Sequence, residues 1–407
     1  MSKVWISSVV LSALLVTGGV AAGVVAHSNR IIVDPPQAPT SSDVLIPLEP
    51  KQSDATALQA RVEQLAQNPA LGTLGAQITD VTTGETIFTQ AATTPMLPAS
   101  SVKTLTAAAA LLQLGRQDRI ETPLYQDGST LIIKASGDVW LDNTALDTMA
   151  AAAQGEVTEV LIDTSIWQGA NFLPGWEQED IAAGFIAPIE PAMLYGARIG
   201  AESGDVPRSA TPAADVAKAL AQRVGAASVG FGAVRGAEIA SVSSPVLSQR
   251  LEEMMEESDN VMAEAIGREL SATDPTGEVL RILNAAGFDT QGVTLVDNSG
   301  LSTNNRLPAA LLEQLMRRAA TDETLRPLLA TLPTAGSTGT LEDRYPNAGR
   351  GWVRAKTGTL TAVTALTGVV PGQNGHLYSF ALISNDSEIL PARAAVDAIA
   401  AALREAP

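Results

Sequence analysis

Strand-forming runs stand at both ends of the folded part of the chain, and this arrangement restricts the fold more than any other sequence feature. Near the start, residues 76–81 and 86–89 are short β-prone runs around a Thr-Gly pair, which predicts a hairpin. Near the end, three more runs predict strands over 352–356, 360–370 and 377–383. Helical patterns lie outside both groups. We therefore expect one sheet built from both ends of the chain and flanked by helices, with mostly helical chain between them.

Shorter strand-like runs return between about residues 120 and 240, within that otherwise helical middle. They cover 130–134, 160–162 and 229–234. The predicted fold class is therefore mixed α/β (α+β): an antiparallel sheet flanked by helices and interrupted by a smaller inserted domain. The predicted boundaries are 55–120 and 240–407 for the main domain and 121–239 for the insertion.

The N-terminus predicts export from the cytoplasm. Lys3 precedes an uncharged, mostly apolar stretch that runs from Val4 to Ala26. Since about 20 apolar residues can span a bilayer, residues 1–26 are expected to form a signal peptide or an uncleaved signal anchor. Residues 27–54 are Pro-rich and predict an extended extracytoplasmic linker. The folded part is then extracytoplasmic, secreted or membrane-anchored, and meets the membrane only through the N-terminal segment.

The composition of the chain excludes several kinds of partner and of catalytic site. The chain has 407 residues with 26 basic and 44 acidic side chains, a net charge of −18, which argues against a nucleic-acid partner. It contains no cysteine and only His27 and His376, so thiol nucleophiles, disulfides and multi-histidine metal sites are excluded. We expect no metal and no cofactor, and an exposed, inert His376 beside a turn. Proton transfer is left to Lys, Asp, Glu, Tyr or Ser.

The first candidate motif is a Ser-x-x-Lys pair at the start of an Ala- and Leu-rich helical run. Ser100 and Lys103 stand three residues apart just after Pro98, and the run closes at Gly115. Residues three apart share one face of a helix, so Lys103 can reach the Ser100 hydroxyl and act as its base if burial lowers its pKa. The alternative is an N-cap serine beside a solvated lysine.

Two further motifs follow. Ser258-Asp259-Asn260 interrupts two helical runs, where Ser258 could relay a proton and Asn260 could orient a substrate amide; helix capping is the alternative. Lys356-Thr357-Gly358-Thr359 stands at the end of a predicted strand. There the glycine admits a substrate backbone, and Lys356, Thr357 and Thr359 could bind a terminal carboxylate. The charge of Lys356 could also help to keep Lys103 neutral; an ordinary strand end is the alternative.

Together, Ser-x-x-Lys, Ser-x-Asn and Lys-Thr-Gly are the signature of penicillin-recognising serine enzymes. The chain resembles the penicillin-binding protein 4-type D-alanyl-D-alanine carboxypeptidases/endopeptidases, the class C low-molecular-mass penicillin-binding proteins. Five blocks carry the resemblance: Pro98–Lys103, Ser258–Asn260, Asp297–Ser302, Gly336–Leu341 and Arg354–Thr359. That family also carries extra chain between its first two motifs, although the insertion here looks short for it.

The resemblance implies a β-lactamase/transpeptidase-like domain that acts on peptidoglycan stem peptides, with β-lactam antibiotics as covalent inhibitors. Ser100 would form the acyl-enzyme, and Lys103 would take its proton. Ser258 and Lys356 would protonate the leaving group. Substrate would be held by Asn260, Thr357, Gly358 and Thr359. Asp297 and Ser299 would brace the site.

Two alternatives stay open. A serine β-lactamase of class A needs a glutamate ahead of a Leu-Asn pair; here the residue three before Leu283 is Leu280, and Glu278 is out of register. A catalytically silent wall-binding scaffold would not need Ser100, Lys103 and their partners to be intact. The sequence does not separate carboxypeptidase from endopeptidase activity, because both use one acyl-enzyme.

Overall fold

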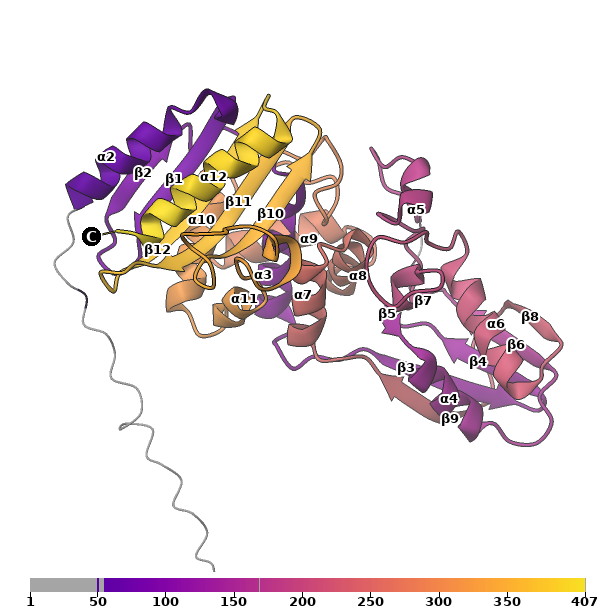
Figure 1. Cartoon of the computed structure of the whole chain (residues 1–407). Coiled ribbons are helices and arrows are strands. Elements are labelled where there is room, and N and C mark those ends of the chain that lie inside the picture. The colour runs from indigo at the N-terminus through magenta and orange to yellow at the C-terminus, as the bar shows by residue number, and fades with distance from the viewer. Residues whose placement is uncertain (1–49, 51–54, 168, 407) are drawn as a thin grey trace, which may run out of the picture. The chain divides into compact units, whose positions relative to one another are not determined.

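The strands from the two ends of the chain form one five-stranded antiparallel sheet, as predicted. The computed structural model describes Pro50 and residues 55–167 and 169–406. The strand order is β10-β11-β12-β1-β2, so the C-terminal strand β12 pairs directly with the N-terminal strand β1 (Figure 1). The bounds are β1 Thr73–Asp80, β2 Thr86–Gln90, β10 Arg354–Leu360, β11 Val363–Pro371 and β12 Leu377–Asn385.

Both faces of this sheet are buried, because successive side chains of its central strands enter two different cores. On β12, Phe380 and Leu382 join one hydrophobic cluster, while Ala381 and Ile383 join the other. The first cluster is covered by α2 (Ala55–Ala66) and α12 (Ile389–Arg404), which contact each other on the near side of the sheet in Figure 1. The terminal helices therefore cover one face together.

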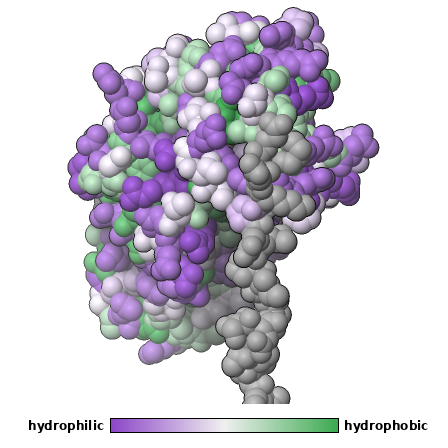
Figure 2. Space-filling model, turned by 90° about the vertical axis from the view of Figure 1, so that its left-hand side faces the viewer, coloured by the Kyte–Doolittle hydropathy of each residue, from purple (hydrophilic) through white to green (hydrophobic). Residues whose placement is uncertain are grey.

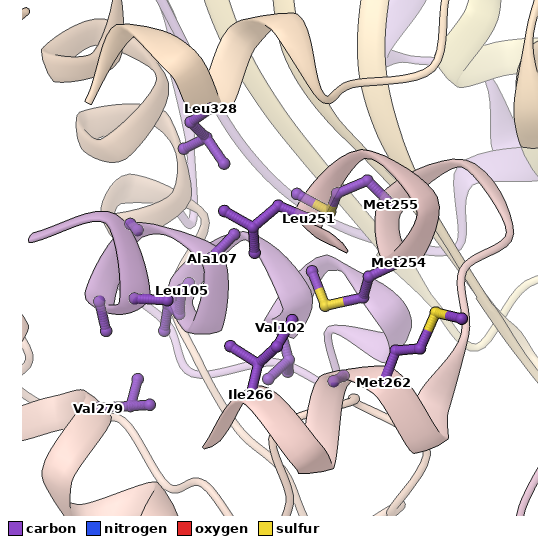
Figure 3. Close-up of a cluster of buried hydrophobic side chains, with 14 of the residues drawn as sticks. Val102, Leu105, Ala107, Leu251, Met254, Met255, Met262, Ile266, Val279 and Leu328 are labelled. Carbon is purple, nitrogen blue, oxygen red and sulfur yellow. The ribbon is translucent and has the colours of Figure 1, made fainter. Parts of the chain in front are cut away.

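The second face is covered by the helical middle of the chain. Its elements are α3 Lys103–Gln113, α7 Leu247–Glu256, α8 Asn260–Leu270, α9 Pro275–Ala285, α10 Ala309–Thr321 and α11 Arg326–Ala330. Helix α3 is buried along almost its whole length, which explains its run of Ala and Leu without charged residues after Lys103. Figure 3 shows side chains of α3, α7, α8 and α9 that meet around it, among them Leu105, Met254 and Ile266.

A second five-stranded sheet, with the order β8-β6-β4-β3-β9, lies mostly in the predicted insertion, although its last strand continues past residue 239. Its strands are β3 Glu121–Asp127, β4 Thr130–Lys134, β6 Glu159–Asp163, β8 Ser228–Phe231 and β9 Ala237–Ser243. Helices α4 (Asn143–Ala152) and α6 (Pro212–Val224) pack on it around a third hydrophobic cluster. Short strands β5 (Asp138–Leu141) and β7 (Ala192–Leu194), the 3-10 turn η4 (Tyr195–Ala197) and helix α5 (Glu179–Ala183) complete the region. The division into domains at 121 and 239 stays a prediction.

Two expectations were wrong. Lys356-Thr357-Gly358 lies within β10 and not at a strand end, because the chain turns only at Ala362, which has a positive φ of 59°. His376 is buried and not exposed: its Nδ1 lies 2.6 Å from Asp80 Oδ2, since the pairing of β1 with β12 brings these strand ends together.

The predicted signal segment 1–26 and most of the linker 27–54 lie outside the described residues. In the part of the chain that the structure describes, none of the helices has both the length and the apolar character that crossing a membrane requires. On the face in Figure 2, hydrophilic residues predominate and hydrophobic ones form small separate areas, which fits the large excess of acidic side chains.

Candidate active site

Ser100 and Lys103 stand where a short 3-10 turn passes into helix α3. The turn η3 covers Ala99–Val102, and α3 begins at Lys103. Ala99 has a φ of 49°, a conformation that costs a non-glycine residue energy and that the surrounding structure must enforce. Gly300 packs beneath this turn; a Cβ there would come within 2.0 Å of the Ala99 carbonyl oxygen, so only glycine allows the approach. The turn thus places Ser100 three residues before Lys103, the first residue of the buried helix α3.

The Lys103 amine is held between three oxygens. Its Nζ donates to Ser100 Oγ at 3.1 Å, to Asn260 Oδ1 at 2.7 Å and to the Ser299 carbonyl at 2.8 Å. The side chain is fully buried, and burial lowers the pKa of Lys103 to about 8, although the nearby carboxylates Asp297, Asp259 and Glu264 act to raise it. Burial, rather than the charge of Lys356, is thus the main reason why this amine can lose its proton near neutral pH.

Two buried carboxyl groups lie behind Lys103. Asp297 accepts hydrogen bonds from the Gly300 and Ser302 amides, Asn305 Nδ2 and Trp176 Nε1. Glu264 accepts from the backbone amide and Nδ2 of Asn298, and burial together with the charge of Asp297 raises the pKa of Glu264 to about 8. Asp297 was predicted to brace the site, whereas Glu264 was missed. Its one signal is a charged residue four positions after Asn260 on a buried helix.

The second pair consists of Ser258 and Lys356. Ser258 lies in the turn between α7 and α8 with a φ of 55°, and Lys356 Nζ donates to its Oγ at 2.8 Å. Lys356 is fully buried, and burial, followed by the charges of Lys103 and Arg344, lowers the pKa of Lys356 well below its usual value. Because two ammonium groups repel each other here, the site favours carrying fewer than two protonated lysines.

The rest of the third motif shapes the wall of the site. A Cβ on Gly358 would come within 2.7 Å of the Pro98 carbonyl oxygen, so the glycine lets β10 pack directly against the turn that carries Ser100. Thr357 Oγ1 donates to Thr340 Oγ1 at 2.8 Å, and Thr359 Oγ1 accepts from Arg393 at 3.4 Å. Thr340 belongs to one of the five blocks quoted above but was assigned no role there.

These motifs meet at one cavity of about 570 Å³. Of the predicted residues, Ser100, Ser258, Asn260 and Thr359 line it, and Lys103 and Lys356 lie behind the two serines. Thr357 and Gly358 belong to the same strand but do not line the cavity itself. The rest of the wall includes the basic residue Arg208 and five acidic residues: Glu177, Asp180, Asp205, Glu257 and Asp259.

This arrangement can perform acyl transfer without histidine. It offers a hydroxyl next to a buried amine of lowered pKa, and a second hydroxyl–amine pair across the cavity. Among the described residues, no three His, Asp or Glu side chains are grouped so that they could hold a metal ion. Glu278, the glutamate nearest to the position that a class A β-lactamase would use, is paired with Arg281 at 2.7 Å and does not line the cavity.

Comparison with known proteins gives the family and the fold. The model of the D-Ala-D-Ala carboxypeptidase 3 (S13) family matches residues 58–229 and 198–405. The chain is 39% identical to carboxypeptidase DacB of Mycolicibacterium smegmatis over 98% of this chain and 94% of that protein. The crystal structure of penicillin-binding protein 4 (DacB) from Haemophilus influenzae aligns with a TM-score of 0.68 and 21% identity, over 86% of this chain and 98% of the other. Its complex with a β-lactam aligns at 0.64 and 23%, over 83% and 97%.

Proposed function

The chain belongs to the D-Ala-D-Ala carboxypeptidase 3 (S13) family, and from that membership we propose that Ser100 is the nucleophile with which it cleaves peptidoglycan stem peptides. The protein is a serine-type carboxypeptidase of the penicillin-binding protein class. One observation carries the assignment of Ser100: its hydroxyl lies 3.1 Å from a buried amine and opens into the cavity lined by the other two motifs.

In the proposed acylation step, Ser100 Oγ attacks the carbonyl carbon of the penultimate D-alanine while neutral Lys103 takes the hydroxyl proton. The backbone N–H groups of Ser100 and Thr359 receive the oxyanion, an interaction worth about 3–4 kcal/mol per donor in such sites. Asn260 is held by Lys103 and by the Phe185 carbonyl, which leaves it fixed beside the acyl part of the substrate. Thr359, which lines the cavity, and Lys356 behind it would bind the terminal carboxylate. Thr357 would act through Thr340, a cavity residue to which its Oγ1 donates at 2.8 Å.

The leaving group is protonated from the second pair. As the peptide C–N bond breaks, Ser258 Oγ gives its proton to the departing amine and regains one through Lys356, whose Nζ lies 2.8 Å away. A water molecule then attacks the acyl carbon, and the Lys103 ammonium returns its proton to Ser100 Oγ as the ester breaks. Of the two protons of the water, one restores the Ser258–Lys356 pair and one goes to solvent, and the shortened stem peptide leaves as a carboxylate. A β-lactam presents a similar amide, so we propose that it acylates Ser100 as a covalent inhibitor.

The cellular setting follows from this substrate. Peptidoglycan lies outside the cytoplasmic membrane, so an enzyme that acts on it works there. We propose that residues 1–26 direct export or anchor the protein, and that contact with the membrane is made through this segment. Residues 27–54 would link it to the catalytic part.

Digestion of purified muropeptides distinguishes carboxypeptidase from endopeptidase activity, because the two reactions release different products. We expect the catalytic part, residues 55–407, to release free D-alanine from pentapeptide stems, because the chain belongs to the D-Ala-D-Ala carboxypeptidase 3 (S13) family. Cleaved cross-links in the same digest would add endopeptidase activity. Intact pentapeptides and intact cross-links after digestion would contradict the proposal and favour a silent scaffold.

The β-lactamase alternative predicts a different outcome with the same protein. Fast turnover of nitrocefin would require a carboxylate placed to activate the deacylating water. Glu278 does not fill that role, because it pairs with Arg281 away from the cavity. Since the class A glutamate is missing from the cavity, we expect slow hydrolysis of nitrocefin. Fast turnover would favour the β-lactamase alternative and would assign the deacylating base to an acidic residue of the cavity wall, such as Glu177 or Glu257.

The rate of acylation should rise with pH as Lys103 loses its proton. A lowered pKa of about 8 means that the amine is mostly protonated at pH 6 and mostly neutral above about pH 9. Rate constants for β-lactam acylation, measured from about pH 6 to pH 10, should increase about tenfold per pH unit below the midpoint and then level off.

Glu264 provides the control for this pH profile, since its pKa is also raised to about 8. In a Glu264→Gln variant the rising part should persist and move to lower pH, because the carboxylate no longer favours the charged form of Lys103. Loss of the rising part in this variant would assign the titration to Glu264 and contradict the role of Lys103.

A further inference from the structure

Two arginines of the inserted region converge on the middle residue of the second motif. Arg198 Nη2 lies 2.7 Å and Arg208 Nη2 lies 2.6 Å from the same oxygen, Oδ2 of Asp259. All three side chains are at most 2% exposed. Burying three charged groups is costly unless their hydrogen bonds are satisfied, so the partners of each group show what the cluster holds together.

The remaining donors of both arginines bind the backbone of their own segment. Arg198 donates from Nε to the Gly204 carbonyl at 3.0 Å and from Nη1 to the Tyr195 carbonyl at 3.1 Å. Arg208 donates from Nε to the Gly184 carbonyl and from Nη1 to the Gly196 carbonyl, both at 2.7 Å. Residues 184–208 are thus folded around the two guanidinium groups, and both groups form ion pairs with Asp259.

The other carboxylate oxygen of Asp259 caps the N-terminus of helix α8, which begins with Asn260. Oδ1 accepts the Met262 amide at 2.9 Å and so caps α8, whose first residue is Asn260. One carboxylate therefore joins the inserted segment to the beginning of α8. Ser258, on its other side, has a positive φ, a conformation that persists only where the surroundings hold it.

Two further hydrogen bonds tie the same segment to the same turn. Asn260 Nδ2 donates to the Phe185 carbonyl at 3.0 Å, and the Gly204 amide donates to Glu257 Oε2 at 3.0 Å. Residues 257, 259 and 260 are therefore all held by the insertion, and Ser258 lies between them.

We infer that residues 184–208 of the insertion act as a clamp that positions Ser258 and Asn260, with Arg198 and Arg208 as positioning residues that work through Asp259. This inference rests on the proposed function of Ser258 and Asn260. The alternative is a buried ion cluster that contributes only to folding. A clamp variant that still folds should react more slowly than the wild type. If the ion cluster contributes only to folding, a folded variant should react at the wild-type rate.

The clamp also bears on the charge of Lys103. The groups that face this amine are the carboxyls of Asp259, Asp297 and Glu264 and the amine of Lys356. Arg198 and Arg208 offset the charge of Asp259, the member of this group that they touch. Removing one guanidinium leaves less positive charge beside the Asp259 carboxylate. That carboxylate then favours the protonated form of Lys103 more strongly, so the pKa of Lys103 should rise.

The test uses single variants that leave Asp259 one partner, Arg198→Gln and Arg208→Gln, with Arg250→Gln as the matched control. Arg250 is fully buried and paired with Glu269 and, at 3.0 Å, with Asp118. Like Arg198, and unlike Arg208, it does not line the cavity, so Arg198→Gln is the closer match to this control. The rate constant for acylation of Ser100 by benzylpenicillin is measured by intact-protein mass spectrometry across the pH range, and the melting temperature is measured in parallel.

We expect acylation to slow about tenfold to a hundredfold in both clamp variants, because displacing a catalytic group by about 1 Å costs on this order. The midpoint of their pH profile should move to higher pH. The Arg250→Gln variant should lose melting temperature but keep the wild-type rate constant and midpoint.

Rate constants within about twofold of the wild type in both folded clamp variants would overturn the inference. If a glutamine variant does not fold, Arg198→Lys and Arg208→Lys keep the charge but lose the forked hydrogen bonds. The rate criterion then applies to them, and their pH midpoint should stay near that of the wild type because the charge beside Asp259 is kept. Failure of the wild-type protein to form an adduct on Ser100 is a separate result, which would refute the proposed function itself.

Discussion

We expect a Ser100→Ala variant to fold normally and to lose D-alanine release by a factor of about 10⁴–10⁶, the range seen when a serine enzyme loses its nucleophile. The loss is large because the hydroxyl forms the covalent intermediate, and the described cavity presents one other motif serine, Ser258, which is bonded to Lys356. Release of D-alanine from a pentapeptide stem, measured with purified wild-type and variant protein, checks this expectation.

The adjacent serine provides the matched control. Ser101 is buried and donates to the Pro98 carbonyl at 2.7 Å, so Ser101→Ala removes one structural hydrogen bond and should cost about 1 kcal/mol of stability. Its turnover should stay within a few-fold of the wild type. Normal turnover by Ser100→Ala would show that another group forms the acyl-enzyme.

The second large effect is expected at Lys103. A Lys103→Met variant keeps most of the side-chain volume but removes the base, and general base catalysis typically contributes a factor of about 10²–10⁴. Acylation by benzylpenicillin should slow by that factor, and its rise with pH around 8 should disappear. Stopped-flow or mass-spectrometric acylation rates measure both changes.

Lys134→Met is the corresponding control, since this exposed lysine ends strand β4 of the insertion. It should acylate at the wild-type rate with an unchanged pH profile. A Lys103→Met protein that acylates as fast as this control would show that a different group takes the Ser100 proton.

The three motifs could be predicted because each is local in sequence. The spacing of Ser100 and Lys103 at a helix start, and the polar break between α7 and α8 at Ser258, depend on a few neighbouring residues. The strands at both chain ends likewise followed from short apolar patterns, and β1 and β12 pair as one sheet. Local patterns thus predicted the main sheet and the identity of the candidate catalytic side chains.

What could not be predicted depends on pairs that are distant in sequence. His376 and Asp80 meet across 296 positions, and a turn with one histidine gives no sign of such a partner. Nothing in the residues around Arg198 and Arg208 indicates that both are buried against Asp259. Glu264 is a single acidic residue on an apolar helix, and its raised pKa arises only from burial beside Asp297.

The strand that carries Lys356 shows a different difficulty. Gly358 is typical of a strand end, so the strand was predicted to stop there. In the structure β10 continues to Leu360, because the missing side chain lets it pack against Pro98 rather than ending the pairing with β11. A glycine required for close packing and a glycine that ends a strand look alike in one sequence.

Peptide mapping after incubation with benzylpenicillin tests the central claim most directly. If the buried Lys103 amine activates Ser100, the wild-type protein should gain one penicilloyl group, and that group should map to the peptide that contains Ser100. An unmodified protein, or an adduct confined to a peptide without Ser100, would contradict the account.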